Sequence, residues 1–447
     1  MAPDGKQRFV LVGGGLAGGL LATFLGRSGY EVELFERRSD PQAGNFVGGR
    51  SINLAVSVRG IDALRRAGLA EEVLHSAIPM RGRMIHALDG RLYFQPYDKD
   101  PTRCIYSIGR GALNAATLNA ARRYPNVRVH FSARCVDVDL ERPAARIARD
   151  GDATEEIACD ALIGVDGAFS AVRRAMQRCD RFDYSQTYLE HGYKELAIPP
   201  GGDGAWRLEK NALHIWPRRS YMMIALPNPD GSFTCTLFWP FEGSSSFASI
   251  RGDDDVRAFF ERSFPDAVPL MPTLLDDFRR NPTGSMVTIR CRPWQYEGRV
   301  VLVGDAAHAV VPFYGQGMNA AFEDCVVFEE CLRRHAPDLR AAFVDYEARR
   351  LPNTDALADL AVDNFVEMRD KTASRRFRAY KRLDRALHRL APFWYTPLYT
   401  LVTFTRTPYA EAARRARRQD RAVAAAGAII LAALALAAVS LARAIAN

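Results

Sequence analysis

The stretch from Arg8 to Glu36 limits the possible folds of this chain more than any other. Phe9 to Val12 is a short apolar run typical of a strand buried on both faces, and apolar residues then recur at helical spacing. Between the two lie Gly13, Gly15 and Gly18, in the pattern G-x-G-x-x-G. The sequence therefore predicts a strand, a tight turn, a helix and a second strand.

Each glycine of this turn has a physical task if the unit binds a dinucleotide. The first permits the turn, the second lets the backbone approach a pyrophosphate at the helix N-terminus, and the third lets the helix pack on the strand. Glu36 ends the second strand, where a carboxylate accepts hydrogen bonds from a ribose. Glycine-rich helix starts also serve plain packing, but strand, helix and terminal glutamate together favour dinucleotide binding.

Chain length and cysteine placement bound the rest. At 447 residues the chain exceeds one ordinary core, so two or three domains are expected. Its eight cysteines include no C-x-x-C pair, which argues against a zinc site and a disulfide framework. We expect no metal.

The net charge of +8 is regional. Residues 371–421 hold fourteen Lys and Arg against three acidic residues, and the remainder of the chain is slightly negative. A general nucleic-acid-binding surface is therefore not expected. Residues 422–442 follow as 21 uncharged, alanine-rich positions, long enough to cross a bilayer as a helix. A buried or surface-lying helix is the alternative.

Basic residues directly before this run favour the membrane reading. Five arginines lie between Arg414 and Arg421, and such clusters favour the cytoplasmic face and anionic headgroups. We therefore predict a membrane anchor at 422–442 with the rest of the chain on the cytoplasmic side. A solvated basic helix is the alternative reading of the cluster.

The segment Ile78 to His86 alternates as a strand does, and Asp89-Gly90 predicts a hairpin turn after it. Arg81 and Arg83 would share one strand face. Two such arginines usually face water, but an arginine turned inward is a natural partner for a carboxylate ligand.

Two further glycine-bearing turns follow apolar strands. The first runs from Asp166-Gly167 through Ser170 to Arg173, and its polar residues could also be a helix cap and a surface charge. The second is Gly304-Asp305, where Asp305 can bond a polyol hydroxyl. Beyond it, Gly315 and Gly317 would offer backbone N–H groups at a helix start.

The strand and helix patterns predict an α/β protein with a Rossmann-like domain, an antiparallel-sheet domain and C-terminal helices. Residues 182–285 change to aromatic-rich alternating strands, which suit a sheet lying over the cofactor. Past 340 the pattern is helical, with breaks expected at four prolines, of which Pro352 is the first. The expected division is 1–181 and 286–350 for the dinucleotide-binding domain, 182–285 for the substrate domain, 351–421 for a helical cap and 422–442 for the anchor.

The three glycine turns in this order resemble those of the flavoprotein aromatic hydroxylases. In that family the first binds ADP, the second contributes to the FAD and pyridine-nucleotide surfaces, and the third binds the ribityl chain and flavin ring. The similarity extends over nearly the whole chain to the branch acting on kynurenine. It is carried by the segments 49–55, 78–86, 181–186, 222–228, 233–238, 312–319 and 397–400.

This resemblance implies a set of site residues. The amino-acid group of kynurenine would be held by Arg83, Tyr97, Asn364 and Tyr399. Residues that would line the FAD are Gly13, Gly15, Ala17, Gly18, Glu36, Arg38, Ala55, Arg110, Cys135, Asp166, Ala171, Asp305, Gly317, Met318 and Asn319. Ala171 departs from the family in replacing a hydroxyl residue, and Cys135 could contribute only its backbone.

An aromatic substrate also needs an apolar pocket for its ring. Side chains suited to it, each of which could instead be core, are Leu213, Met222, Ile224, Phe238, Pro312 and Phe313. Gln316 is the candidate polar neighbour of flavin and substrate.

The resemblance also implies the reaction. NADPH would reduce a noncovalent FAD, O2 would add as a C4a-hydroperoxide, and L-kynurenine would become 3-hydroxykynurenine, a step of tryptophan catabolism. The cofactor carries this chemistry, so no catalytic side chain is expected. The alternatives are a related hydroxylase of another aromatic acid and a flavin-binding membrane protein without turnover.

Overall fold

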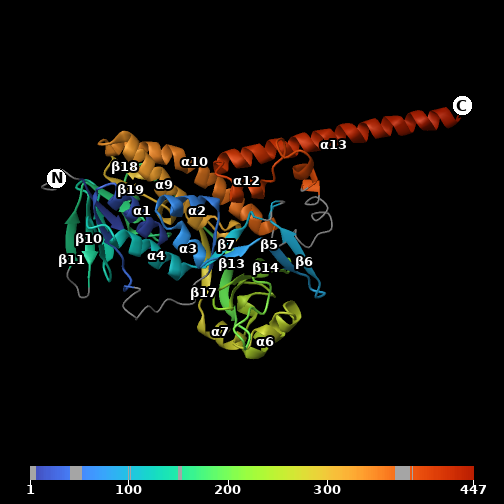
Figure 1. Cartoon of the computed structure of the whole chain (residues 1–447), viewed down its shortest axis with the longest axis horizontal. Helices are drawn as coiled ribbons and strands as arrows, with labels where there is room; N and C mark the ends of the chain where they lie inside the picture. The colour runs from blue at the N-terminus through green and yellow to red at the C-terminus, as the bar shows by residue number, and fades with distance from the viewer. Residues whose placement is uncertain are drawn as a thin grey trace.

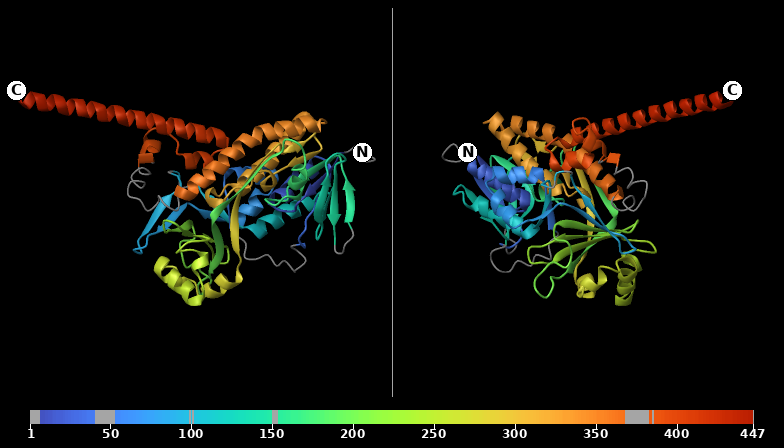
Figure 2. Two further views of the ribbon diagram at one scale, coloured as in Figure 1. Left: turned by 180° about the vertical axis from the view of Figure 1, so that it is seen from behind. Right: turned by 45° about the vertical axis from the view of Figure 1, so that its right-hand side comes forward.

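The computed structural model describes residues 7–40, 53–98, 100, 102–149, 154–367, 383–384 and 386–446. A parallel sheet with its helices forms one end of the molecule, and a largely antiparallel sheet with two short helices lies below it (Figure 1). Long helices cross the top and lead into a C-terminal helix that projects away from the body (Figures 1 and 2). Residues 49–52 of the segment 49–55, which carries part of the family resemblance, lie outside the described residues.

The first sheet has six strands in the order β18-β19-β12-β1-β2-β8, and only β18 and β19 pair antiparallel. Its strands are β1 (Arg8–Val12), β2 (Glu31–Phe35), β8 (Val127–His130), β12 (Ala161–Gly164), β18 (Gln295–Tyr296) and β19 (Val300–Leu302). This confirms the predicted strand, turn, helix and strand, since α1 (Leu16–Arg27) joins β1 to β2. The central strands β1, β12 and β19 are almost entirely buried and apolar because helices cover the sheet, as parallel sheets require.

Strand order explains why the three glycine turns act together. β19, β12, β1 and β2 are neighbours, and their carboxyl ends meet at one edge of the sheet. Each strand end is followed by one predicted site element: β19 by the turn at Gly304, β12 by the turn at Asp166, β1 by the turn at Gly13 and β2 by Glu36. Ligands of open α/β sheets bind at such an edge.

Two small sheets and several helices complete this part of the molecule. One sheet is β11-β10-β9 and the other is β3-β7-β4. Their strands are β3 (Asn53–Val56), β4 (Ile78–Met80), β7 (Ile105–Gly109), β9 (Arg134–Asp139), β10 (Ala144–Ala148) and β11 (Thr154–Ala158). The helices are α2 (Val58–Arg66), α3 (Ala70–His75), α4 (Arg110–Arg122), α5 (Ala171–Met176), α8 (Asp305–His308) and α9 (Gly317–His335).

The large sheet has seven strands in the order β17-β13-β16-β15-β14-β5-β6. They are β5 (Gly82–His86), β6 (Leu92–Pro96), β13 (Asp183–Ile198), β14 (Ala212–Pro217), β15 (Met222–Pro227), β16 (Phe233–Pro240) and β17 (Thr283–Arg292). It is antiparallel except where β14 pairs parallel with β5. The sheet is thus assembled from separate stretches of chain, with the hairpin β5–β6 coming from well before residue 182.

The prediction of one continuous strand over Ile78 to His86 was wrong. The segment divides at Arg81: β4 pairs with β7 in a small sheet, and β5 pairs with β14 and β6 in the large one. Gly82 permits the crossing, because an added Cβ would lie 2.4 Å from the carbonyl oxygen of Gln95. Arg81 is consequently exposed between the strands, so it does not share a strand face with Arg83.

The two faces of the large sheet have different neighbours. α6 (Asp253–Ser263) and α7 (Leu274–Arg280) supply side chains to the core on one face, around Trp216 and Trp239. The register places Arg83 beside Leu213, Ile215 beside Ile224, and Met222 beside Phe238 on the opposite face. This second face packs against helices and loops from the rest of the chain.

Three C-terminal helices are described: α10 (Leu339–Val366), α12 (Leu398–Phe404) and α13 (Tyr409–Ala446). The break expected at Pro352 is wrong, because α10 continues through it. Proline removes one backbone hydrogen bond from a helix. Nearby, the Asn353 side chain donates to the carbonyl oxygen of Arg349 at 2.7 Å, and the Thr354 hydroxyl donates to that of Leu351 at 3.1 Å. Pro397 and Pro408 precede α12 and α13, as expected of breaks.

Candidate active site

The Gly13–Gly18 turn has a geometry that glycine alone allows. Gly13 has φ +113°, and a Cβ there would lie 2.6 Å from the carbonyl oxygen of Val165. A Cβ on Gly18 would lie 1.9 Å from the carbonyl oxygen of Gly13. Beside Gly15, by contrast, there is open space within 4 Å, at the N-terminus of α1, which no side chain caps. This cradle fits a pyrophosphate.

Glu36 follows β2 and faces this turn. Its carboxylate accepts hydrogen bonds from the backbone N–H of Gly14 at 2.8 Å and of Arg38 at 2.9 Å. These bonds fix the carboxylate at the cradle, while the Arg38 side chain stays exposed. Ala17 lies across from the third turn, since a Cβ added to Gly304 would be 3.7 Å from the Cβ of Ala17.

Asp305 and Arg110 lie close enough for the charge of Arg110 to act on the Asp305 carboxyl. Asp305 is exposed. Its carboxyl is nevertheless surrounded by protein, and this burial raises its pKa against the opposing effects of His308 and Arg110. Arg110 begins α4 and is likewise exposed, so both fit a polyol and phosphate chain.

The turn at Asp166 fastens two strand ends together. Asp166 accepts from the N–H of Ala171 at 2.6 Å, and its other carboxylate oxygen is buried without a partner. Ser170 caps α5 by accepting from the N–H of Arg173 at 2.9 Å. Arg173 then donates to the carbonyl oxygen of Ala306 at 2.7 Å, which ties this turn to α8. Ser170 is thus a helix cap, but Arg173 is buried and is not the surface charge of the alternative reading. The contribution of Asp166 to the cofactor site stays a prediction.

Cys135 lies in β9, near the same turn, and is buried. Burial raises the pKa of its thiol to about 12, with the charge of Asp166 adding to the effect. The side chain donates to the carbonyl oxygen of Asp137 at 3.3 Å. A neutral thiol in this state offers no reactive group, which agrees with a contribution from its backbone only.

The loop before α9 is held by one buried amide. Asn319 donates to the carbonyl oxygens of Ala55 at 2.9 Å and Gly315 at 2.8 Å, and it accepts from the N–H of Ser57 at 2.8 Å. Gly315 has φ +65°. Gly317 begins α9, next to the half-buried Met318, with only Val310 near its Cβ position. The N–H groups of this helix start thus lie beside Ala55.

Gln316 has other neighbours than those expected. Its side chain is 2% exposed, lies 3.4 Å from the Ser57 hydroxyl and accepts from the Tyr409 hydroxyl at 3.0 Å. These contacts lead toward α13. No described contact joins Gln316 to Arg83, so a role next to the substrate stays a prediction.

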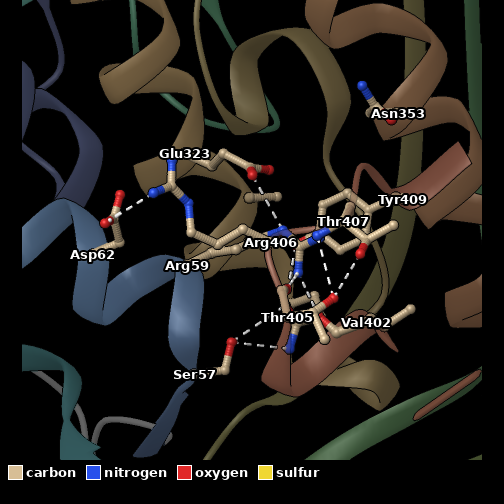
Figure 3. A network of polar contacts seen from close by, with 12 residues as sticks. Ser57, Arg59, Asp62, Glu323, Asn353, Val402, Thr405, Arg406, Thr407 and Tyr409 are labelled. Atoms are coloured by element: carbon tan, nitrogen blue, oxygen red, sulfur yellow. Dashed lines mark hydrogen bonds and ion pairs between the residues drawn. The ribbon is translucent and has the colours of Figure 1, made fainter. Parts of the chain in front are cut away.

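Arg59 continues that connection (Figure 3). Its fully buried guanidinium pairs with Glu323 at 3.2 Å and lies 4.0 Å above the Tyr409 ring. It also donates to the carbonyl oxygens of Val402, Thr405 and Thr407 (Figure 3). The segment that precedes α13 is thereby fastened to α2.

The expected carboxylate-binding residues meet on the second face of the large sheet. Arg83 lies 4.7 Å from the ring centre of Tyr399 and 5.7 Å from that of Tyr97, and the two rings stack at 5.3 Å. The Arg83 Nε and the Tyr97 hydroxyl are buried without a partner. Burial lowers the pKa of Arg83, but Tyr399, Tyr97 and Glu367 raise it overall, so the guanidinium is charged.

Asn364 contacts the apolar residues that lie on the same face as Arg83. It donates to the carbonyl oxygen of Phe313 at 2.8 Å, and Phe313 stacks on Phe365 at 4.1 Å and contacts Phe238 at 4.8 Å. Pro312 begins the 3-10 turn that carries Phe313. Residues expected around the ring all lie in or against one apolar cluster, apart from Pro312: Leu213, Met222, Ile224, Phe238 and Phe313.

Two residues of this face were missed by sequence reasoning. Tyr314 stacks on Tyr399 at 5.8 Å and follows Phe313, so its place in the segment 312–319 could have identified it. Thr236 lies beside Ile224 and across from Glu195, and its buried hydroxyl has no partner. The alternation of β16 puts Thr236 on the same face as Phe238, which was the available signal.

Comparison with known proteins identifies the family. A family model described as an FAD binding domain matches residues 7–197 and 252–360. A kynurenine 3-monooxygenase of Salinispora arenicola (strain CNS-205) is 48% identical over 436 residues, covering 97% of this chain and 96% of the relative. Another of Dictyostelium discoideum is 45% identical, covering 91% and 90%.

Solved structures agree on the fold alone. A 2-methyl-3-hydroxypyridine-5-carboxylic acid oxygenase has a TM-score of 0.67 at 21% identity and covers 83% of this chain and 94% of its own. PqsL of P. aeruginosa, in complex with 2-aminobenzoylacetate, has a TM-score of 0.66 at 20% identity, covering 82% and 97%. With the flavin-type cradle and the close relatives together, the chain belongs to the kynurenine 3-monooxygenase family of FAD-binding proteins.

Proposed function

We propose that this protein hydroxylates L-kynurenine to 3-hydroxykynurenine with NADPH and O2 on one noncovalently bound FAD. The observation that carries the substrate assignment is the partly buried Arg83, whose buried Nε lacks a partner beside the partnerless hydroxyl of Tyr97. A buried guanidinium N–H without an acceptor is costly, so such a site favours a ligand that supplies one, as a carboxylate does. The relatives named as kynurenine 3-monooxygenases support the identity of that ligand.

The side chains position the substrate, and the cofactor supplies hydride acceptance and oxygen activation. Arg83 would hold the kynurenine carboxylate, and Tyr97, Tyr399 and Asn364 would complete its polar surroundings. The apolar cluster around Phe313 would take the aniline ring and exclude water from it. Ala55 packs against both the Gly315 turn and the cluster of Tyr97, which supports a short path from the flavin side to the substrate side.

Ligand-stimulated NADPH oxidation tests this function. The purified holoenzyme should oxidise NADPH slowly alone and much faster with L-kynurenine. Other aromatic acids, lacking the amino-acid group placed against Arg83, should stimulate weakly. Stronger stimulation by another aromatic acid would assign the chain to a related hydroxylase, and oxidation that no ligand changes would argue for a flavin-binding protein without turnover.

FAD should be bound tightly but without a covalent link. The Gly13–Gly18 cradle, Glu36 and Asp305 offer phosphate and hydroxyl contacts. The described thiols near them, Cys135 and Cys325, are buried, and burial raises the pKa of each, so both are neutral. Denaturation followed by filtration should release one free FAD per chain. Flavin that stays with the precipitated protein would refute noncovalent binding, and protein unable to take up flavin would refute the whole assignment.

The C-terminal helix should anchor the chain in a membrane. Within the described residues one helix, Tyr409–Ser440, is long and apolar enough to span a membrane. Its apolar 18-residue stretch has a mean hydropathy of 2.6, and none of that stretch is buried. The arginines between 414 and 421 support a cytoplasmic position of the body. Deleting residues 422–447 removes no side chain described as buried and leaves the Arg59 contacts in place, so it should yield soluble, active enzyme.

Fractionation checks this expectation. Full-length protein should need detergent for extraction, and the shortened chain should not. Full-length protein that stays soluble without detergent would contradict the anchor.

A further inference from the structure

A pocket of about 440 Å³ lies where α13 leaves the body of the molecule. Trp394 forms one side of it, and α13 supplies the other side through Glu411, Arg414, Arg415, Arg418 and Gln419. These helix positions recur three and four residues apart, so they form one stripe along the helix. The pocket is therefore walled by one indole and a mainly basic helix face.

The positive charge of this stripe is largely uncompensated. Arg414 and Arg418 are exposed, and within the described residues neither makes an ion pair. Arg415 makes one long hydrogen bond, at 3.5 Å, to the hydroxyl of Thr396. Glu411 is the single acidic residue in the lining against three arginines. Such a wall is complementary to a phosphate.

The helix sets the depth of this pocket relative to a bilayer. The uncharged run begins at Ala422, and Arg418 precedes it by four residues, or about 6 Å along the axis. The headgroup layer on each side of a bilayer is about 5–8 Å thick. If α13 spans, Arg418 and the pocket lie in that layer.

Exposed apolar side chains beside the pocket also indicate a position in the headgroup layer. Leu390 is 82% exposed, Phe393 97% and Trp394 52%. The turn that bears them is fixed to α13, since the carbonyl oxygen of Trp394 accepts from the amide of Gln419 at 2.7 Å. Large exposed apolar side chains are unfavourable in water, and tryptophan is enriched at membrane interfaces.

We propose that this pocket binds the phosphate of an anionic phospholipid, with Leu390 and Phe393 entering the interface beside it. The proposal deepens the membrane anchoring argued above and rests on it. A soluble phosphate would meet the same arginines, but it would not cover the adjacent Leu390, Phe393 and Trp394. α13 would then give attachment, and the pocket would give preference for anionic lipid.

Tryptophan quenching in nanodiscs tests the preference directly. Full-length holoenzyme would be reconstituted with phosphatidylcholine and a low fraction of brominated lipid, either phosphatidylglycerol or phosphatidylcholine. Of the other four tryptophans, Trp216, Trp239 and Trp294 are fully buried, and Trp206 packs against the core below the large sheet, which α6 and α7 share. Trp394 is therefore the expected reporter, and Trp394→Phe should remove most of the quenching. Wild type should show markedly stronger quenching by the anionic lipid.

Arg418→Gln and Arg417→Gln form a matched pair. They remove the same charge from adjacent exposed positions, but only Arg418 lines the pocket. Arg418→Gln should reduce the apparent affinity for anionic lipid about fivefold, the effect of one basic residue near a membrane surface, and Arg417→Gln should reduce it less. Excess inorganic phosphate should not abolish the preference.

The outcomes separate the two proposals. Protein that does not enter nanodiscs would refute the anchor itself. Protein that enters but is quenched equally by both lipids, or that loses the preference equally in the two variants, would refute the headgroup site while leaving the anchor intact. Loss of the preference in excess phosphate would show that the pocket takes soluble phosphate.

Discussion

Replacing Arg83 with methionine should weaken L-kynurenine binding by about 30- to 1,000-fold while FAD binding is retained. Losing a charge-assisted hydrogen-bonded pair in a partly dry pocket costs roughly 2–4 kcal/mol. Methionine fills a similar length and removes a partly buried charge, so the variant should fold with little loss of stability. Titration of the bound flavin's fluorescence with L-kynurenine would give the affinity.

Arg81→Met is the matched control. Arg81 is exposed, and its described contacts use only the backbone: its N–H donates to Asn211 at 2.8 Å and its carbonyl oxygen accepts from Tyr97 at 3.1 Å. Neither contact depends on the side chain, so this variant should bind L-kynurenine almost normally. Equal loss in both variants, or no loss in Arg83→Met, would mean that another residue holds the carboxylate or that the substrate is different.

Asp324→Asn should lower the free energy of unfolding by roughly 3–5 kcal/mol, because it removes the carboxylate of a buried ion pair and leaves its positively charged partner uncompensated. Asp324 lies 2.5 Å from the Nε2 of His308 and 2.6 Å from the Nε of Arg350, and it also accepts from the N–H of Gly304 at 3.2 Å. It therefore ties α9 and α10 to the third glycine turn. Urea denaturation followed by far-UV circular dichroism and flavin release would measure the loss.

Asp345→Asn is the control for this prediction. Asp345 also contacts an arginine and a histidine, Arg334 at 2.9 Å and His335 at 3.1 Å, but these groups lie nearer the surface. Exposed pairs contribute about 0–1 kcal/mol, so the loss should be small. Similar losses in the two variants would contradict a special role for the buried group.

The pH dependence of this stabilisation has a defined sign. Burial alone would raise the pKa of Asp324, but His308 and Arg350 outweigh it and leave the pKa below its ordinary value. A lowered pKa means that the stabilisation is complete above the unfolded-state value, about 3.9, and is lost as the pH falls below it. The difference between wild type and Asp324→Asn should thus shrink as the pH falls below about 3.9.

Local sequence patterns predicted the parts of the fold that depend on neighbouring residues. The Gly13–Gly18 turn is dictated by backbone geometry, since added side chains at Gly13 and Gly18 would overlap the chain itself. The strand of β1 and the helix of α1 were accordingly predictable from periodicity alone. So was the hairpin at Asp89–Gly90, where Gly90 has φ +79°.

Long-range pairing was not predictable in the same way. Nothing within Ile78–His86 shows that β4 and β5 enter different sheets, because that division depends on partners such as β14, far along the chain. Pro352 likewise reads as a helix break until the surroundings of α10 are known. The partners of Gln316 and the orphan hydroxyl of Thr236 also come only from tertiary packing.

Oxygen-18 incorporation tests the proposed reaction most directly. Purified full-length enzyme with bound FAD would be given L-kynurenine, NADPH and 18O2, and the product would be analysed by mass spectrometry. The proposed function requires 3-hydroxykynurenine carrying one 18O atom at ring carbon 3, formed in proportion to the NADPH oxidised. Hydrogen peroxide without hydroxylated kynurenine, or a hydroxyl oxygen derived from water, would contradict it.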